Sequence, residues 1–146
     1  MANDAQGGAI VGCGRMGKLH LHNLLARDDV RVLHLVDPLD EALQDVEIPA
    51  GAKRSRLAVA LGDERVGAVV VATPTPAHAT VILSALRAGK HVLAEAPLCC
   101  DALEAPPLFE EAQKRGVLLW TSLPRRYDPQ VIAAKEALDS RALGKP

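Results

Sequence analysis

The stretch Ala9-Ile10-Val11-Gly12-Cys13-Gly14-Arg15-Met16-Gly17 joins a short apolar run to three glycines spaced as G-x-G-x-x-G. The polar, periodic segment 18–27 that follows predicts a helix. A strand that turns directly into a helix leaves backbone N–H groups unpaired at the positive end of the helix dipole, where a pyrophosphate can bind. We therefore expect a cofactor-binding turn at this point, with Arg15 and Met16 among its contacts.

Each of the three glycines has a separate task in such a turn. Gly12 permits the tight bend, Gly14 lets the backbone approach the phosphates, and Gly17 allows the helix to pack closely on the strand. The chain contains 11 glycines, so the spacing alone is weak evidence and the rest of the chain has to support it.

The composition predicts one globular domain without nucleic-acid affinity. A chain of 146 residues can bury one core, and a second full domain does not fit, so we expect a single domain over 1–146. It contains only three aromatic residues, and its formal net charge is −1. Base-stacking modules need exposed rings, and polyanion binding needs a basic field, so neither is expected.

The spacing of the cysteines and the shortness of the apolar runs predict a cytoplasmic protein. Cys13, Cys99 and Cys100 form neither a zinc-like spacing nor a disulfide framework. We expect Cys99 and Cys100 to be two reduced, semi-buried thiols in preference to a strained vicinal disulfide. The bland interpretation of Cys13 is a small residue that fits a crowded loop, and the alternative is a thiol whose pKa is lowered by the helix N-terminus. Residues 1–4 lack the pattern of a signal peptide, and no apolar run reaches transmembrane length, so no membrane partner is expected.

Strand and helix patterns alternate along the chain. We expect strands at 8–12, 31–37, 52–54, 66–72, 91–95 and 117–122. We expect helices at 18–27, 39–46, 57–61, 76–88, 101–115 and 129–141, with a break near Pro106-Pro107 inside the fifth. This alternation predicts an α/β protein with a doubly wound parallel sheet (a Rossmann fold) of about six strands, whose ligands bind at the carboxyl ends of the strands.

Asp37 closes the second expected strand, twenty residues after Gly17. A carboxylate at this place accepts hydrogen bonds from the adenosine ribose hydroxyls and repels a 2′-phosphate, so Asp37 predicts NAD in preference to NADP. The alternative is a solvated turn residue before Pro38.

Further polar residues follow the fourth and fifth expected strands. Thr73, Pro74 and His78 come after the fourth strand, and Glu95 ends the fifth. We expect them to line the nicotinamide half of a cofactor site. Two alternatives stay open: the prolines can simply stiffen the entry of a helix, and His78 can be a capping or surface residue.

The motifs, taken in order, resemble the N-terminal domain of the glucose-fructose oxidoreductase / inositol dehydrogenase (Gfo/Idh/MocA) family over essentially the whole chain. The matching segments are the glycine turn 12–17, His20, Thr73-Pro74 with His78, the A-G-K-H-V-L-A-E-A-P-L stretch 88–98, the R-R-Y-D-P stretch 125–129 and the A-L-G-K-P stretch 142–146. The resemblance implies NAD(P)-dependent hydride transfer at a hydroxyl-bearing carbon of a sugar, inositol or related polyol.

Two departures from the family pattern concern catalysis. Ala96 stands where the family has its catalytic lysine, and alanine has no titratable proton. The family continues into a substrate-binding domain, whereas this sequence stops at Pro146. We therefore expect no catalytic residue here, and a polyol or sugar substrate only if a second domain is supplied.

These observations leave three hypotheses. The chain can be the cofactor domain of a dehydrogenase that is inactive by itself, a non-enzymatic dinucleotide-binding or interaction module, or a truncated product. The surface that faces the second domain in the family would be exposed, and self-association through it is expected. The roles of Arg125 and Arg126 stay open between substrate contact and pairing with Asp128.

Overall fold

The computed structural model describes residues 5–142 and residue 144. Residues 1–4, used above to exclude a signal peptide, and residues 143, 145 and 146 of the A-L-G-K-P stretch lie outside the described residues. The strands are β1 (Gln6–Val11), β2 (Val30–Val36), β3 (Lys53–Arg54), β4 (Ala68–Val71), β5 (His91–Ala94) and β6 (Leu119–Thr121). The helices are α1 (Arg15–Leu25), α2 (Leu57–Gly62), α3 (Thr75–Arg87), α4 (Ala105–Arg115) and α5 (Pro129–Asp139), with short 3-10 turns η1 (Asp40–Leu43), η2 (Ala102–Glu104) and η3 (Pro124–Tyr127).

The strands form one six-stranded sheet in the order β3-β2-β1-β4-β5-β6. Every neighbouring pair is parallel, from β2·β3 at one edge to β5·β6 at the other. The order reverses between β1 and β4, which is the switch point of a doubly wound sheet. The predicted fold class is therefore confirmed.

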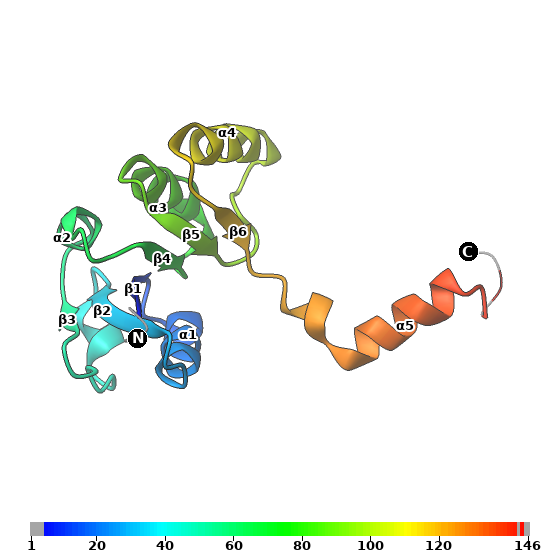
Figure 1. Ribbon diagram of the computed structural model, residues 1–146, viewed down its shortest axis with the longest axis horizontal. Coiled ribbons are helices and arrows are strands. Elements are labelled where there is room, and N and C mark those ends of the chain that lie inside the picture. Colours follow the sequence, from blue (N-terminus) through cyan, green and yellow to red (C-terminus); the bar gives the residue numbers. More distant parts are fainter. Residues whose placement is uncertain (1–4, 143, 145–146) are drawn as a thin grey trace.

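Two hydrophobic clusters lie on opposite faces of this sheet. One joins alternate residues of the strands, such as Val69 and Val92, to buried residues of α2, α3 and α4. The other joins the alternate set, including Ile10 and Val70, to Leu21 of α1. Figure 1 shows α1 on the opposite side of the sheet from α3 and α4, and shows α5 extending away from the body. β4 is a central strand of the sheet, and the two clusters pack on its two faces. It therefore consists of a continuous apolar run.

Several boundaries differ from the predicted ones. The helix after the glycine turn begins at Arg15, inside the motif, because Gly14 is already its N-cap. The predicted helix 39–46 is only the 3-10 turn η1. The predicted segment 101–115 is interrupted, as expected, but the break falls just before the prolines: η2 ends at Glu104 and α4 starts at Ala105. Pro106 and Pro107 therefore lie in the first turn of α4, where their missing N–H groups have no helical partner to lose.

Among the described residues, no helix is long and apolar enough to cross a lipid bilayer.

Candidate functional site

The glycine turn packs against the end of the neighbouring strand β4. Gly12 has a φ of +89°, and a Cβ there would lie 2.5 Å from backbone atoms of Ala72 and Thr73. A Cβ at Gly17 would lie 1.9 Å from the carbonyl oxygen of Gly12. A side chain at either position therefore collides with backbone, which cannot move aside without opening the turn.

Gly14 is placed differently from the other two glycines. No described atom outside its immediate neighbours lies within 4 Å of the Cβ position at Gly14, and the residue is exposed. The open space lies at the N-terminus of α1, where the described structure has no side-chain cap and no acidic residue in the first turn. Arg15 is exposed and Met16 half-buried beside it. Uncapped N–H groups and a cation favour an anionic ligand at this point.

Asp37 is held directly against the glycine turn. Its Oδ2 accepts a hydrogen bond from the backbone N–H of Cys13 at 2.7 Å, and its Oδ1 accepts one from the N–H of Leu39 at 2.9 Å. A carboxylate has about four acceptor positions, so each oxygen can accept a further hydrogen bond. The side chain thus presents a half-buried negative charge next to the open turn.

Cys13 in the same turn is a neutral thiol. Burial, and then the charge of Asp37, raise the pKa of the Cys13 thiol to about 11. Its Sγ lies 3.8 Å from the carbonyl oxygen of Val36, which accepts a weak hydrogen bond. The residue therefore fills a crowded loop, as the bland interpretation of the cysteines predicts.

His78 is a buried residue that joins two loops. Its Nδ1 lies 2.8 Å from the carbonyl oxygen of Pro97, after β5, and its Nε2 lies 2.8 Å from that of Thr73, after β4. The alternative of a surface histidine is wrong, because only 1% of the residue is exposed. The alternative of a helix cap is not supported either, since α3 has no side-chain hydrogen bond at its N-cap. Both ring nitrogens are engaged with main chain, so His78 positions the loops in this structure instead of offering a free polar atom.

The Thr73-Pro74 loop contains an unsatisfied polar atom. The Oγ1 of Thr73 is buried and has no hydrogen-bond partner among the described residues. Pro74 is the exposed N-cap of α3. A buried hydroxyl without a partner is costly in a folded protein and is commonly explained by an absent ligand or water. Since Thr73 borders Gly12, this hydroxyl fits a ligand that occupies the glycine turn.

Glu95 pairs with a histidine of α1. The Oε1 of Glu95 lies 2.6 Å from the Nε2 of His20, and both side chains are largely shielded from solvent. The pair joins the helix that begins in the glycine turn to the end of β5, across the switch point. The residue next to Glu95, Ala96, is exposed and offers only a methyl group.

His20 was not among the site residues that we predicted from the chemistry of the strand ends. One signal could have found it: His20 lies three residues after Gly17, so one helical turn places it near the carboxyl edge of the sheet.

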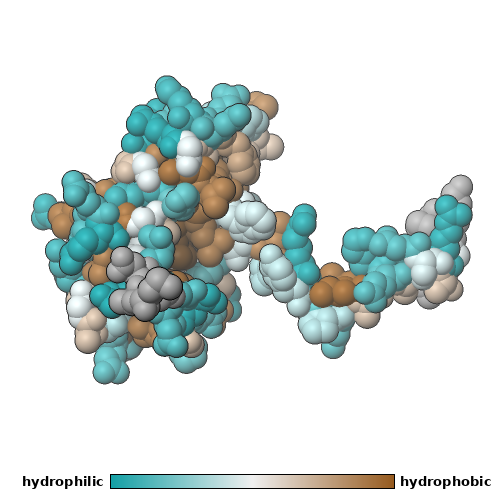
Figure 2. Space-filling model, in the orientation of Figure 1, coloured by the Kyte–Doolittle hydropathy of each residue, from teal (hydrophilic) through white to brown (hydrophobic). Residues whose placement is uncertain are grey.

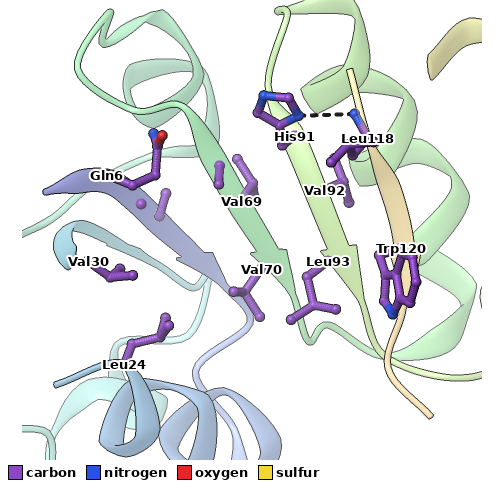
Figure 3. A pocket seen from close by; sticks show the side chains of 13 residues that line it. Gln6, Leu24, Val30, Val69, Val70, His91, Val92, Leu93, Leu118 and Trp120 are labelled. Carbon is purple, nitrogen blue, oxygen red and sulfur yellow. Dashed lines mark hydrogen bonds between the residues drawn. The ribbon is translucent and has the colours of Figure 1, made fainter. Parts of the chain in front are cut away.

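The assembled residues suit a dinucleotide. The open Gly14 and the N-terminus of α1 suit phosphates, and the Asp37 carboxylate suits ribose hydroxyls. The unpaired hydroxyl belongs to Thr73, whose backbone borders Gly12. An apolar hollow of about 270 Å³ lies elsewhere, on the open face of the sheet beside Val70, Leu93 and Trp120 (Figure 3). Its walls are almost entirely apolar, so it suits packing against another apolar surface better than a charged ligand.

Comparison with known proteins identifies the same kind of domain. Residues 7–123 match the sequence profile described as an oxidoreductase family with a NAD-binding Rossmann fold. The chain is 30% identical over 139 residues to myo-inositol 2-dehydrogenase of Thermotoga maritima, covering 94% of this chain and 42% of that enzyme. The chain thus spans about two fifths of the length of the curated relatives that it matches.

Solved structures share the fold closely. GenD2 from gentamicin A biosynthesis, in complex with NAD, is 34% identical with a TM-score of 0.88, covering 94% of this chain and 40% of its own. KijD10, a 3-ketoreductase of Actinomadura kijaniata in complex with NADP and TDP-benzene, is 30% identical with a TM-score of 0.84, covering 93% of this chain and 42% of its own.

Proposed function

The chain belongs to the Gfo/Idh/MocA oxidoreductase family, and from this premise we propose that it is the NAD-binding domain of a dehydrogenase that acts on polyols or sugars. The site at the carboxyl edge of the sheet holds the dinucleotide. The substrate class is supported by the inositol dehydrogenases among the relatives. The proposed setting is a single domain in the cytoplasm, as composition predicts.

The observation that carries this proposal is the hydrogen bond from the Cys13 N–H to the Asp37 carboxylate at 2.7 Å. It sets a negative charge directly beside the turn that would bind the pyrophosphate. Ribose hydroxyls donate to a carboxylate, whereas a 2′-phosphate is repelled by it. The proposed preference is therefore NAD over NADP, although the solved relatives include complexes with either cofactor.

The proposed roles of the chain's residues follow their positions. Residues 12–17 hold the pyrophosphate, and Thr73 donates or accepts a hydrogen bond beside it. His78 positions the loops after β4 and β5, and the His20–Glu95 pair holds α1 against the end of β5. A bound nicotinamide supplies the capacity to exchange a hydride with a substrate carbon.

We propose that this chain by itself binds the cofactor without oxidising polyols. Ala96 cannot handle a proton, and loss of an acid–base group costs about 10²–10⁴ in rate. A second candidate function, a non-enzymatic dinucleotide-binding or interaction module, is favoured by the same alanine. Measurable NAD reduction by the purified chain with inositol or glucose would contradict both the inactive cofactor domain and the non-enzymatic module.

Calorimetric titration with NAD, NADH and NADP tests cofactor binding. We expect NAD and NADH to bind more tightly than NADP. Asp37→Ala should weaken NAD about tenfold or more, since a hydrogen bond to a charged group is worth about 1.5–3 kcal/mol, and should weaken NADP less. Asp40→Ala, which removes a nearby exposed carboxylate from η1, is the matched control and should leave both affinities unchanged. No binding of any dinucleotide, or equal changes for NAD and NADP, would contradict the proposal.

A further inference from the structure

The hydrogen-bond partners of the His78 ring determine its charge. Its Nδ1 lies 2.8 Å from the carbonyl oxygen of Pro97, and its Nε2 lies 2.8 Å from that of Thr73. Both partners are main-chain carbonyl groups, which only accept hydrogen bonds. A neutral imidazole has a single N–H, so one ring nitrogen would turn its lone pair toward a carbonyl oxygen. Both contacts are hydrogen bonds only if both nitrogens carry a proton, which makes the ring an imidazolium.

The other histidines differ from His78 in this respect. His34 faces a carboxylate with one nitrogen and a serine hydroxyl with the other. A hydroxyl either donates or accepts, so a neutral ring satisfies both of these partners. The N–H of Leu118 donates to Nδ1 of His91, so that nitrogen carries no proton. All five histidines lie in the described part of the chain, and His78 is the one with an acceptor at each ring nitrogen.

This positive charge has no counter-charge nearby. On the face that Figure 2 shows, hydrophilic residues cover the outer helices and hydrophobic residues gather toward the middle of the body. The described part of the chain records no ion pair to His78. Carboxylates on the neighbouring elements have partners of their own: Glu95 with His20, Asp101 with Glu104 in the capping box of η2, and Glu111 with Arg115. A buried charge without a partner is costly, so it is typical of a site that receives an opposite charge.

The ring is joined directly to the proposed dinucleotide site. It holds the carbonyl group of Thr73, and the backbone nitrogen of Thr73 lies 2.5 Å from the Cβ position at Gly12. The Oγ1 of the same threonine is buried and has no partner among the described residues. Through the carbonyl group of Pro97, the ring also holds the loop after β5. One ring therefore fastens both loops at the switch point, beside the glycine turn.

We propose that His78 is a fixed imidazolium that holds the loops after β4 and β5 together and supplies positive charge to the diphosphate of the cofactor. The charge of the ring follows from its hydrogen bonds alone, whereas its action on the diphosphate rests on the proposed function. The N-terminus of α3 disfavours a cation, but this effect is smaller than that of two hydrogen bonds from a charged donor.

NMR of the chain labelled with nitrogen-15 histidine measures the charge of the ring. At pH 7, the two His78 nitrogens should have similar chemical shifts and one attached proton each, as in an imidazolium. The His91 ring should instead contain one nitrogen without a proton. The His78 signals are assigned by their loss in His78→Gln or, if that variant does not fold, by substitution of the other histidines. A His78 ring with one unprotonated nitrogen overturns the proposal.

Titration with ADP and with adenosine tests the action on the diphosphate, because these two ligands differ by that group. His78→Gln removes the charge and keeps two N–H donors on its amide group. We expect this variant to bind ADP about tenfold more weakly than the parent, and adenosine equally well. His91→Gln replaces a histidine at the opposite end of β5, and as the matched control it should leave both affinities unchanged.

The outcomes separate this inference from the proposed function. Equal losses of ADP and adenosine affinity, or no loss of either, overturn the action on the diphosphate. If His78→Gln does not fold, the parent decides: ADP should shift the His78 ring signals more than adenosine does, and equal shifts overturn it. A chain that binds neither ADP nor NAD contradicts the proposed function and this action with it, while a doubly protonated ring still confirms the charge. A neutral ring in a chain that binds NAD contradicts this inference alone.

Discussion

Single residues at the strand ends combine structural and binding tasks. Asp37 accepts two backbone N–H groups and still has acceptor capacity, while Cys13 supplies one of those N–H groups and fills the turn with its thiol. His78 engages the main chain with both ring nitrogens. The binding edge is therefore built from side chains that first hold backbone in place.

Thiol labelling should separate the three cysteines. Cys13 is 2% exposed and the pKa of its thiol is raised to about 11, so it carries almost no thiolate at pH 8. Cys99 and Cys100 lie in the more exposed loop after β5. We expect an aromatic disulfide reagent to modify two thiols in the native chain and the third only in denaturant. Peptide mapping identifies them; rapid native labelling of Cys13 would contradict its buried placement.

Asp63 should make the fold sensitive to acid. Hydrogen bonds from Arg65 and His34 hold the pKa of the Asp63 carboxyl well below its usual range. A lowered folded-state pKa means that the stabilisation is complete above the unfolded-state value of about 4. It shrinks as the pH falls below that value and disappears once the pH passes the folded-state pKa. Asp63→Asn should therefore be less stable than the parent at pH 7, with a smaller difference near pH 3.

Urea unfolding across this pH range measures the difference between the two chains. Asp28→Asn removes an exposed carboxylate for which the structure records no ion pair in its described part, and serves as the control. A gap between Asp63→Asn and the parent that is independent of pH would contradict the assignment.

At the scale of elements, the join between β1 and α1 shows how one turn serves both folding and binding. Gly17 sits where a Cβ would meet the Gly12 carbonyl, whereas Gly14 faces open space. Gly17 is therefore required by packing, whereas Gly14 is available to a ligand.

Substituting alanine at these two positions should separate the effects. Gly17→Ala should destabilise the fold by about 1–3 kcal/mol or more, as overpacking against backbone does. Gly14→Ala should leave thermal stability nearly unchanged and weaken NAD, because its methyl group enters the space proposed for the pyrophosphate. Thermal unfolding and NAD titration of both variants provide the check, and a Gly14→Ala chain with parental NAD affinity would argue against a phosphate at that point.

At the scale of the whole molecule, helix α5 does not share the hydrophobic core of the sheet and the helices α1 to α4, which form the body of the molecule. The two hydrophobic clusters lie within residues 9–119, and α5 contributes to neither. The sheet, with α1 to α4, therefore contains the residues that stabilise the body.

A chain shortened to residues 1–127 should keep the fold of the body. Its thermal midpoint should lie within about 2 °C of the parent, since none of the described residues of α5 is buried and the free energy lost is a small part of the total. Circular dichroism measures the midpoint and the loss of helix. Loss of cooperative unfolding would show that α5 stabilises its own body after all.

The alternation of apolar runs and amphipathic segments by itself determined the parallel doubly wound sheet, because period and length are local properties of the chain. The glycine spacing and the position of Asp37 after β2 likewise predicted an edge site, since parallel strands end on the same side. The local patterns did not determine where each helix begins. They leave open that Gly14 caps α1 and that two prolines lie within the first turn of α4.

Only the tertiary structure decided how distant residues pair. His20 and Glu95 are 75 positions apart, and His78 reaches carbonyl groups on two different loops, contacts that no local spacing encodes. The apolar hollow beside Trp120 and the exposure of α5 also emerge only in three dimensions. The physical reason is the same in each case: a sequence pattern states which face of an element is apolar, while the path of the chain decides what that face meets.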